Sequence, residues 1–166
     1  MPNWIQGSLK VRGSYDNVKN FFVKGLNAYR GNEMLDKKDW VLDIDEYNEP
    51  GEREFSMDIK PDTWVYVEDT RRAFVTSNHI CFYEGAYKEN PSLVVAACEI
   101  NQAWCFEEDD WASISKEYNV DIRLWGLEQG VQFGQEIEII DGEVIKNEEF
   151  KYDDWDWDCP LPWFGG

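Results

Sequence analysis

Stretches in which apolar and polar residues alternate recur along the chain, and they restrict its fold more than any other feature. The apolar residues of 4–11, among them Leu9 and Val11, fall on one face of an extended segment, as expected for a half-buried β-strand. Two more alternating runs flank Asp141 and Gly142, a dipeptide that strongly favours a β-hairpin turn. We therefore expect a sheet built largely of antiparallel strands.

Two segments between the strands instead have the spacing of amphipathic helices. In residues 14–27 apolar side chains recur at three- and four-residue intervals, and Ser14 is a suitable N-cap. In residues 107–119 a second apolar stripe includes Trp111 and Ile114, after a run of acids. Acidic residues at the start of a helix interact favourably with its dipole, so we expect a helix in each segment.

The remaining segments complete the expected fold. Several β-like runs lie between residues 54 and 85, and the nearly all-apolar stretch 92–100 predicts a central strand buried on both faces. Residues 31–60 are rich in acids, with Gly, Asn and Pro, and are expected to form an acidic insertion that is irregular over 31–52 apart from one short strand at 40–44. This order predicts a single α+β domain over residues 1–166. Its architecture would be a two-layer sandwich with a ferredoxin-like core and extra antiparallel strands.

The charge of the chain is its second constraint. Thirty-four acidic residues face sixteen basic ones, so the formal net charge is −18. Such a field repels nucleic acids and anionic membranes and attracts basic protein surfaces. Solubility is a simpler explanation, but it requires far fewer charges. The acids are concentrated in 33–58, 107–110 and 136–158, whereas residues 1–30 carry a net positive charge.

Residues 151–166 combine aspartate with tryptophan and are expected to form a C-terminal acidic and aromatic strap. Side chains alternate in an extended segment, so one face would carry Asp154, Asp156 and Asp158 and the other Asp153, Trp155 and Trp157. Carboxylates on one face would recur about every 6.6 Å, close to two phosphate steps of a DNA strand at about 3.4 Å each. Alternatively, the tryptophans fill the edge of the core while the aspartates keep the segment soluble.

The order of motifs at both ends of the chain resembles a known family. "MPNW" precedes an alternating strand, a glycine and a "NVKNFF" helix, and later come "AW", "SKEY" and "IIDGEVI". This order is similar to that of phage- and plasmid-borne proteins with a YubB-type ferredoxin-like domain, over roughly residues 1–26 and 92–150. The resemblance implies a ferredoxin-like fold and a mobile-element origin, and it implies no reaction.

The chain also departs from that family at two positions. Members usually carry cysteine after the opening tryptophan, where this chain has Ile5, and proline often follows the "AW" pair, where it has the acidic run "CFEEDD" at 105–110. The second departure adds negative charge at the junction between a loop and a helix.

Patterns for catalysis or metal binding are weak. Neighbouring carboxylates suit acid–base chemistry or a hard cation, but thirty-four acids produce such neighbours by chance. His79 and Cys81 could form a base–nucleophile pair on one strand, but no third member is visible. Aromatic side chains on a sheet could stack on bases, as in RNA readers, but the negative charge opposes nucleic acid. We therefore expect no enzyme activity, no metal and no cofactor.

These features predict a non-catalytic phage or mobile-element protein in the host cytoplasm, because the chain shows neither a signal peptide nor a membrane-spanning run. It would inhibit a basic host protein, namely a defence protein that binds nucleic acid, by presenting a surface that mimics nucleic acid. Anti-CRISPR and anti-restriction proteins are inhibitors of this type. The alternative is an adaptor, or a self-assembling homodimer, that binds one protein through exposed aromatics. The predicted partner-binding residues are Glu107, Glu108, Asp109, Asp110, Asp153, Asp154, Trp155, Asp156, Trp157, Asp158, Asp43, Asp45 and Glu46.

Overall fold

The computed structural model describes residues 3–86 and 89–166, which form twelve strands and four helices. The helices are α1 (Tyr15–Lys24), α2 (Lys37–Trp40), α3 (Glu108–Tyr118) and α4 (Trp155–Asp158). The strands are β1 (Trp4–Ser14), β2 (Leu26–Arg30), β3 (Glu33–Met34), β4 (Val41–Glu49), β5 (Glu52–Ile59), β6 (Val65–Val67), β7 (Ala73–Val75), β8 (His79–Tyr83), β9 (Leu93–Ala103), β10 (Asp121–Glu128), β11 (Phe133–Ile140) and β12 (Glu143–Phe150). Met1 and Pro2, which begin the "MPNW" motif, lie outside the described residues.

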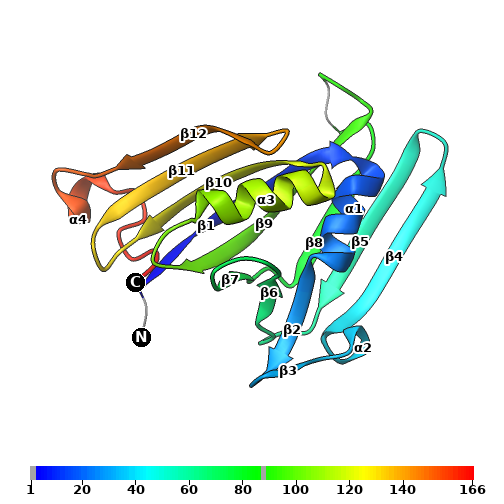
Figure 1. The fold of residues 1–166 in the computed structure, drawn as a ribbon, viewed down its shortest axis with the longest axis horizontal. Helices are drawn as coiled ribbons and strands as arrows, with labels where there is room; N and C mark the ends of the chain where they lie inside the picture. The colour runs from blue at the N-terminus through cyan, green and yellow to red at the C-terminus, as the bar shows by residue number, and fades with distance from the viewer. Residues whose placement is uncertain (1–2, 87–88) are drawn as a thin grey trace.

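The described strands form two sheets in which each strand runs antiparallel to its hydrogen-bonded neighbours. The larger sheet has the order β12-β11-β10-β1-β9-β7-β6-β2-β3, and the smaller has the order β4-β5-β8 (Figure 1). Helices α1 and α3 cover one face of the larger sheet (Figure 1) and touch each other through Phe21 and Tyr118, whose ring centroids lie 5.6 Å apart. The protein is therefore a mixed α/β fold with helices against mostly antiparallel sheets, which agrees with the general fold class expected from the sequence.

Strand β1 lies at the centre of this arrangement because one side of it is apolar throughout. Ile5, Leu9 and Val11 are fully buried towards the helices, whereas Lys10 points to the opposite, open face. Strands β9 and β10 both pair with β1 in antiparallel fashion, so they run parallel to each other, and α3 connects them. The result is a split β-α-β unit with β1 in its middle.

The strongest local signals of the sequence are confirmed. Ser14 caps α1, because its hydroxyl oxygen accepts a hydrogen bond from the Asn17 backbone N–H at 3.3 Å. Asp141 and Gly142 both have positive φ, at 52° and 75°, which is the geometry of a type I′ hairpin turn between β11 and β12. The expected strand at 4–11 and the expected helix at 107–119 are present as β1 and α3.

Two expectations about the remaining segments need correction. Residues 31–60 are largely regular and contain β3, α2 and the long hairpin β4–β5. The expected short strand at 40–44 and the β-like run at 54–59 correspond to β4 and β5, whose full lengths and pairing were not predicted. The stretch 92–100 is not buried on both faces, since Ala97 and Glu99 of β9 are exposed on the open side of the sheet. Of the nine tryptophans, Trp40, Trp111 and Trp155 are buried.

Within the described residues, no helix has both the length and the apolar character that a membrane-spanning helix requires.

Candidate functional site

The acidic run at the start of α3 is largely occupied within the protein. Glu107 forms an ion pair with Arg71, and Asp110 accepts a hydrogen bond from the Arg71 backbone N–H at 2.8 Å. Glu108 accepts a hydrogen bond from the Asn147 side-chain amide at 2.7 Å. These contacts and the favourable interaction of acids with the helix N-terminus give this block a structural role, and Asp109 is its most exposed member.

The acidic residues of β4 lie on an exposed edge strand, since β5 is the one described strand with which β4 pairs. Asp43 accepts a hydrogen bond from the Ile44 backbone N–H, and Asp45 is exposed. Glu46 forms an ion pair with Lys19 at 2.6 Å, and this hydrogen bond lowers the pKa of the Glu46 carboxyl below its usual value. The hairpin therefore presents a mixture of free and paired carboxylates.

The third acidic block is not extended, as the alternation of aspartate and tryptophan predicts, but forms the short helix α4. Asp154 caps it by accepting a hydrogen bond from the Trp157 backbone N–H at 3.2 Å, and Asp158 accepts one from the Asp154 backbone N–H at 3.2 Å. These reciprocal side-chain bonds satisfy donors at the helix start and favour a turn over an extended chain. Asp154, Asp156 and Asp158 therefore do not form a linear row.

Helix α4 is fixed to the rest of the protein by its apolar side. Trp155 is only 5% exposed, and its indole N–H donates to the Pro162 carbonyl oxygen at 2.9 Å. Trp155 and Cys159 pack in a small cluster with Leu127 of β10. Beyond them the chain ends beside β1, where Gly166 and Trp4 exchange two backbone hydrogen bonds of 2.9 and 3.0 Å. The C-terminal segment is thus held at both ends.

Anchoring of Trp155 turns the neighbouring side chains outwards. Trp157 is 86% exposed, and the four surrounding aspartates are all exposed. In the part of the chain that the structure describes, none of these aspartates forms an ion pair. We call this group the acidic knob, and it consists of Asp153, Asp154, Asp156, Trp157 and Asp158.

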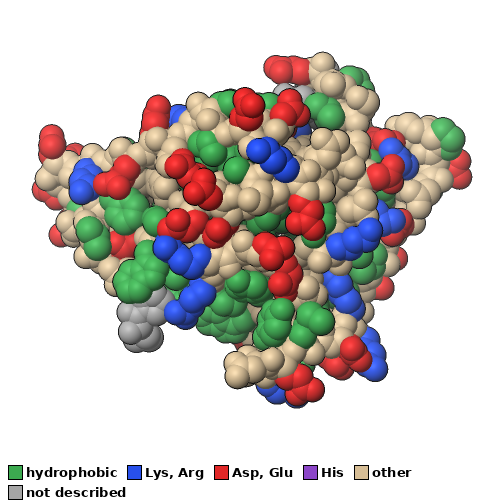
Figure 2. Space-filling model, in the orientation of Figure 1, with side chains coloured by type: hydrophobic (Ala, Val, Ile, Leu, Met, Phe, Trp, Pro, Cys, Tyr) green, Lys and Arg blue, Asp and Glu red, His purple; other side chains and the backbone are tan. Residues whose placement is uncertain are grey.

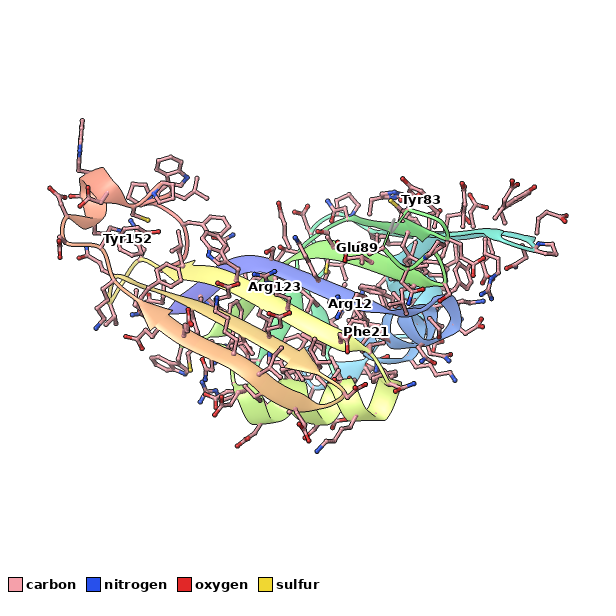
Figure 3. All side chains as sticks on the ribbon, turned by 90° about the horizontal axis from the view of Figure 1, so that it is seen from above. Arg12, Phe21, Tyr83, Glu89, Arg123 and Tyr152 are labelled. Atoms are coloured by element: carbon pink, nitrogen blue, oxygen red, sulfur yellow. The ribbon has the colours of Figure 1, made fainter. Side chains whose placement is uncertain are left out.

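The structure does not bring the three acidic blocks together. The tail around Tyr152 and the β8 strand end at Tyr83 lie at opposite ends of the molecule, and α3 lies on the other side of the sheet from α4 (Figure 3). On the face that carries α3, acidic side chains are interspersed with Lys and Arg rather than gathered in one patch (Figure 2). A single surface made of all three blocks is therefore absent from the described residues, and the acidic knob is the block whose carboxylates form no ion pair among those residues.

A second feature, an aromatic hollow, is not indicated by the charge pattern. It encloses about 670 Å³ beside β6 and β7, where Figure 2 shows hydrophobic side chains with basic ones next to them. In the short strands β6 and β7 the middle side chain, Tyr66 or Phe74, points away from the buried face. This alternation is present in the sequence, but three residues are too few to make it recognisable. The lining residues are Trp4, Tyr29, Gly31, Trp64, Tyr66, Arg72 and Phe74.

The structure gives His79 a carboxylate partner. His79 Nδ1 lies 2.6 Å from the Asp58 carboxylate, and both side chains are about half exposed. Among residues 3–86 and 89–166, no group of three or more His, Cys, Asp or Glu side chains could hold a metal ion. The buried Cys98 has a pKa raised to about 12 by desolvation, which makes its thiol a poor nucleophile.

Comparison of the chain with protein-family models, with curated proteins and with solved structures finds no match in any of the three. The acidic knob and the aromatic hollow are therefore the two features of the molecule that bear on its function.

Proposed function

We propose that this protein is a non-catalytic binding protein whose acidic knob occupies a cationic site on a basic partner. The observation that carries this proposal is that Trp157 is 86% exposed on a helix whose neighbour Trp155 is buried. A large aromatic held in solvent by a fixed backbone loses little conformational freedom on binding, and tryptophan is enriched among residues that dominate binding energy. Carboxylates around it suit a site lined by Lys or Arg.

The partner class follows from the charge of the whole chain. A net charge of −18 accelerates encounter with basic surfaces and opposes contact with nucleic acids and anionic membranes. Proteins that grip nucleic acids present Lys and Arg for phosphate oxygens. We therefore propose that the knob competes with nucleic acid for one phosphate-binding site of a host defence protein, in the manner of an anti-CRISPR or anti-restriction protein.

The form of mimicry is local in this proposal. The four aspartates lie within one short helical segment rather than along an extended row, so they imitate a few phosphates rather than a continuous strand. The β4 edge and the start of α3 add to the long-range field without forming part of the contact. This arrangement makes the complex sensitive to salt, because exposed charges are screened.

The same proposal includes the finer description of the fold and its origin. A ferredoxin-like core is supported by the split unit in which β9 and β10 flank β1 and α3 connects them. The C-terminal segment would act as a strap that positions the acidic knob, with Trp155 as its anchor. The resemblance to phage- and plasmid-borne proteins supports a mobile-element origin and action inside the host cell.

The proposal is tested by capture of partners from bacterial lysate at low and high salt, with identification by mass spectrometry. The informative variant carries Asn at positions 153, 154, 156 and 158, because asparagine preserves the capping of α4. Its matched control is Asp43→Asn, Asp45→Asn, Glu49→Gln and Glu52→Gln, which removes the same number of charges from the β4–β5 hairpin. We expect only the knob variant to lose a nucleic-acid-binding protein that DNA or RNA also displaces. Equal loss with both variants, or no such protein, would overturn the proposal.

A second function is favoured by the exposed aromatics themselves. Trp157 and Trp163 are 86% and 68% exposed on the same terminal segment, which suits an adaptor or a homodimer held by apolar contacts. In that case Trp157→Ala would abolish a salt-resistant interaction that the four-asparagine variant retains. Light scattering of the purified protein distinguishes self-association from binding of a different protein.

A further inference from the structure

We propose that the aromatic hollow binds a nucleotide-class ligand, with the planar base against its rings and the phosphate at Arg72. The site is separate from the acidic knob, and it does not depend on the proposed function. Its lining contains five aromatic side chains and one charged side chain, which is Arg72. A mostly apolar hollow with one placed charge is typical of small-ligand sites.

The rings around the hollow are steeply inclined to one another and support each other's positions. Trp64 lies 5.1 Å from Phe74 at an interplanar angle of 88°, and Trp4 lies 5.8 Å from Phe74 at 68°. Edge-to-face contacts of this kind are favourable, so the walls are preorganised. Even so, Trp64 remains 58% exposed. An exposed indole in a fixed position is a surface on which a flat heteroaromatic group can stack.

Trp4 is held in place by its backbone from two sides. It pairs with Ala103 of β9, and it exchanges two hydrogen bonds with Gly166 at the end of the chain. The Arg72 guanidinium carbon lies 5.4 Å from the centre of the Trp4 ring, within cation–π range. The cation is therefore positioned at the wall of the hollow.

Arg72 itself is fixed in an unusual backbone conformation. Its φ is +52°, a region that residues other than glycine rarely adopt and that often marks ligand-binding loops. Its N–H donates to the Thr70 carbonyl oxygen, and its carbonyl oxygen accepts from the Ala103 N–H. No ion pair links the Arg72 side chain to any residue in 3–86 or 89–166. Its charge is thus available to an anion.

The same features argue against other ligand classes. A quaternary ammonium group would meet the Arg72 cation, and the carboxylate on this side, Glu68, already accepts hydrogen bonds from Asn27 and Tyr29. A long nucleic acid would carry many phosphates into the field of a chain with net charge −18. A mononucleotide brings only one phosphate, for which one arginine suffices, and a base for which the rings provide stacking.

The test is calorimetric titration of the full chain with the 5′-monophosphates of adenosine, guanosine, cytidine and uridine, and with the matching neutral nucleosides. We expect at least one monophosphate to bind about tenfold more tightly than its nucleoside, as one charge-assisted contact allows. Arg72→Gln should remove this difference, and Trp64→Ala should weaken both ligands about tenfold. Tryptophan indole N–H signals in NMR spectra would show whether Trp4 and Trp64 are the rings that sense the ligand.

Trp157→Ala is the matched control, because it removes an exposed tryptophan that does not line the hollow. It should leave nucleotide binding unchanged, whereas Trp64→Ala should leave capture of a protein partner unchanged. The inference and the proposed function therefore fail separately. Absence of binding by all four monophosphates up to about 1 mM, equal binding in Arg72→Gln, or tighter binding of a proline-rich peptide or a trimethylammonium compound would overturn the inference.

Discussion

Trp155 and Trp157 lie two residues apart on the four-residue helix α4, yet one is 5% exposed and the other is 86% exposed. In an extended chain these residues would share a face. The turn imposed by the Asp154 cap separates them, so one tryptophan anchors the segment and the other is presented to solvent. One helical turn therefore holds both a buried tryptophan and an exposed one.

This difference in burial predicts that replacing each tryptophan with alanine has very unequal effects on stability. Trp155→Ala should lower the free energy of unfolding by about 3 kcal/mol, because it removes buried area and the hydrogen bond to Pro162. Trp157→Ala should change it by less than about 0.5 kcal/mol, as exposed sites usually do. Urea unfolding followed by far-UV circular dichroism measures both. Similar losses in the two variants would contradict the assignment of anchor and presented side chain.

A second prediction concerns Glu136 on the open face of the sheet. Its carboxylate accepts from Lys146 Nζ at 2.8 Å and from Arg123 Nε at 3.1 Å, and these two bonds hold the pKa of Glu136 below its usual value. A depressed carboxyl pKa stabilises the fold above the unfolded-state pKa, about 4.3, and this stability is lost as pH falls through the folded-state pKa. Glu136→Gln should therefore cost about 1 kcal/mol at pH 7.

The pH dependence of that loss is the decisive readout. As pH falls through the folded-state pKa, Glu136 becomes protonated in both states, so the stability difference between the wild type and Glu136→Gln should be smaller at pH 3 than at pH 7. Glu138→Gln is the control, because Glu138 lies on the same strand and face but has no ion pair with a described residue. Chemical unfolding at pH 3 and pH 7 makes the comparison. A loss for Glu136→Gln that is the same at both pH values would refute the ion-pair explanation.

Much of the fold follows from local sequence patterns where one face of an element is buried. The alternation in β1, the cap at Ser14 and the turn at Asp141 and Gly142 each carry a physical reason that is independent of distant residues. In the hairpin β4–β5 the run at 54–59 was recognised as β-like, but the length of β4 was underestimated because an exposed strand has no buried face to impose a pattern. Strand order could not be derived either, since it depends on contacts between residues far apart in the chain.

The candidate site shows the same limit. The acidic composition of the tail identified the acidic knob, but its shape depends on the Asp154 cap and on packing of Trp155 against Leu127 of β10. The aromatic hollow combines Trp4 and Trp64, which are sixty residues apart, so no local pattern reveals it. Composition indicated candidate residues, and tertiary structure determined which of them meet.

A third prediction tests the close approach of two central strands. Gly7 of β1 faces Gly126 of β10, and a Cβ atom at Gly7 would lie 1.8 Å from the Trp125 carbonyl oxygen. Because this oxygen belongs to the backbone, the strands would have to separate. Gly7→Ala should therefore destabilise the protein by more than about 3 kcal/mol. Ser8→Ala, on the open face of the same strand, is the control, and a thermal melt in which both variants match the wild type would disprove the close packing.

The last prediction concerns Lys37, whose burial lowers its pKa to about 8. Its ammonium group donates to the Leu26 carbonyl oxygen at 3.0 Å and lies 4.6 Å from the centre of the buried Trp40 ring. These contacts do not fully replace the water that the charge loses. In the unfolded chain the same group titrates near 10.4. Between these two values the unfolded state binds more protons, so the contribution of Lys37 to stability should rise as pH increases.

Lys37→Met should remove this dependence. At pH 7 the variant should be more stable than the wild type by on the order of 1–2 kcal/mol, after allowance for partial exposure, and the difference should shrink as pH approaches 10.5. Lys38→Met is the matched control, because the neighbouring Lys38 side chain is 78% exposed. Urea unfolding at pH 7, 8.5 and 10 gives the three required differences. If the difference between Lys37→Met and the wild type does not vary with pH, desolvation of Lys37 is not the cause.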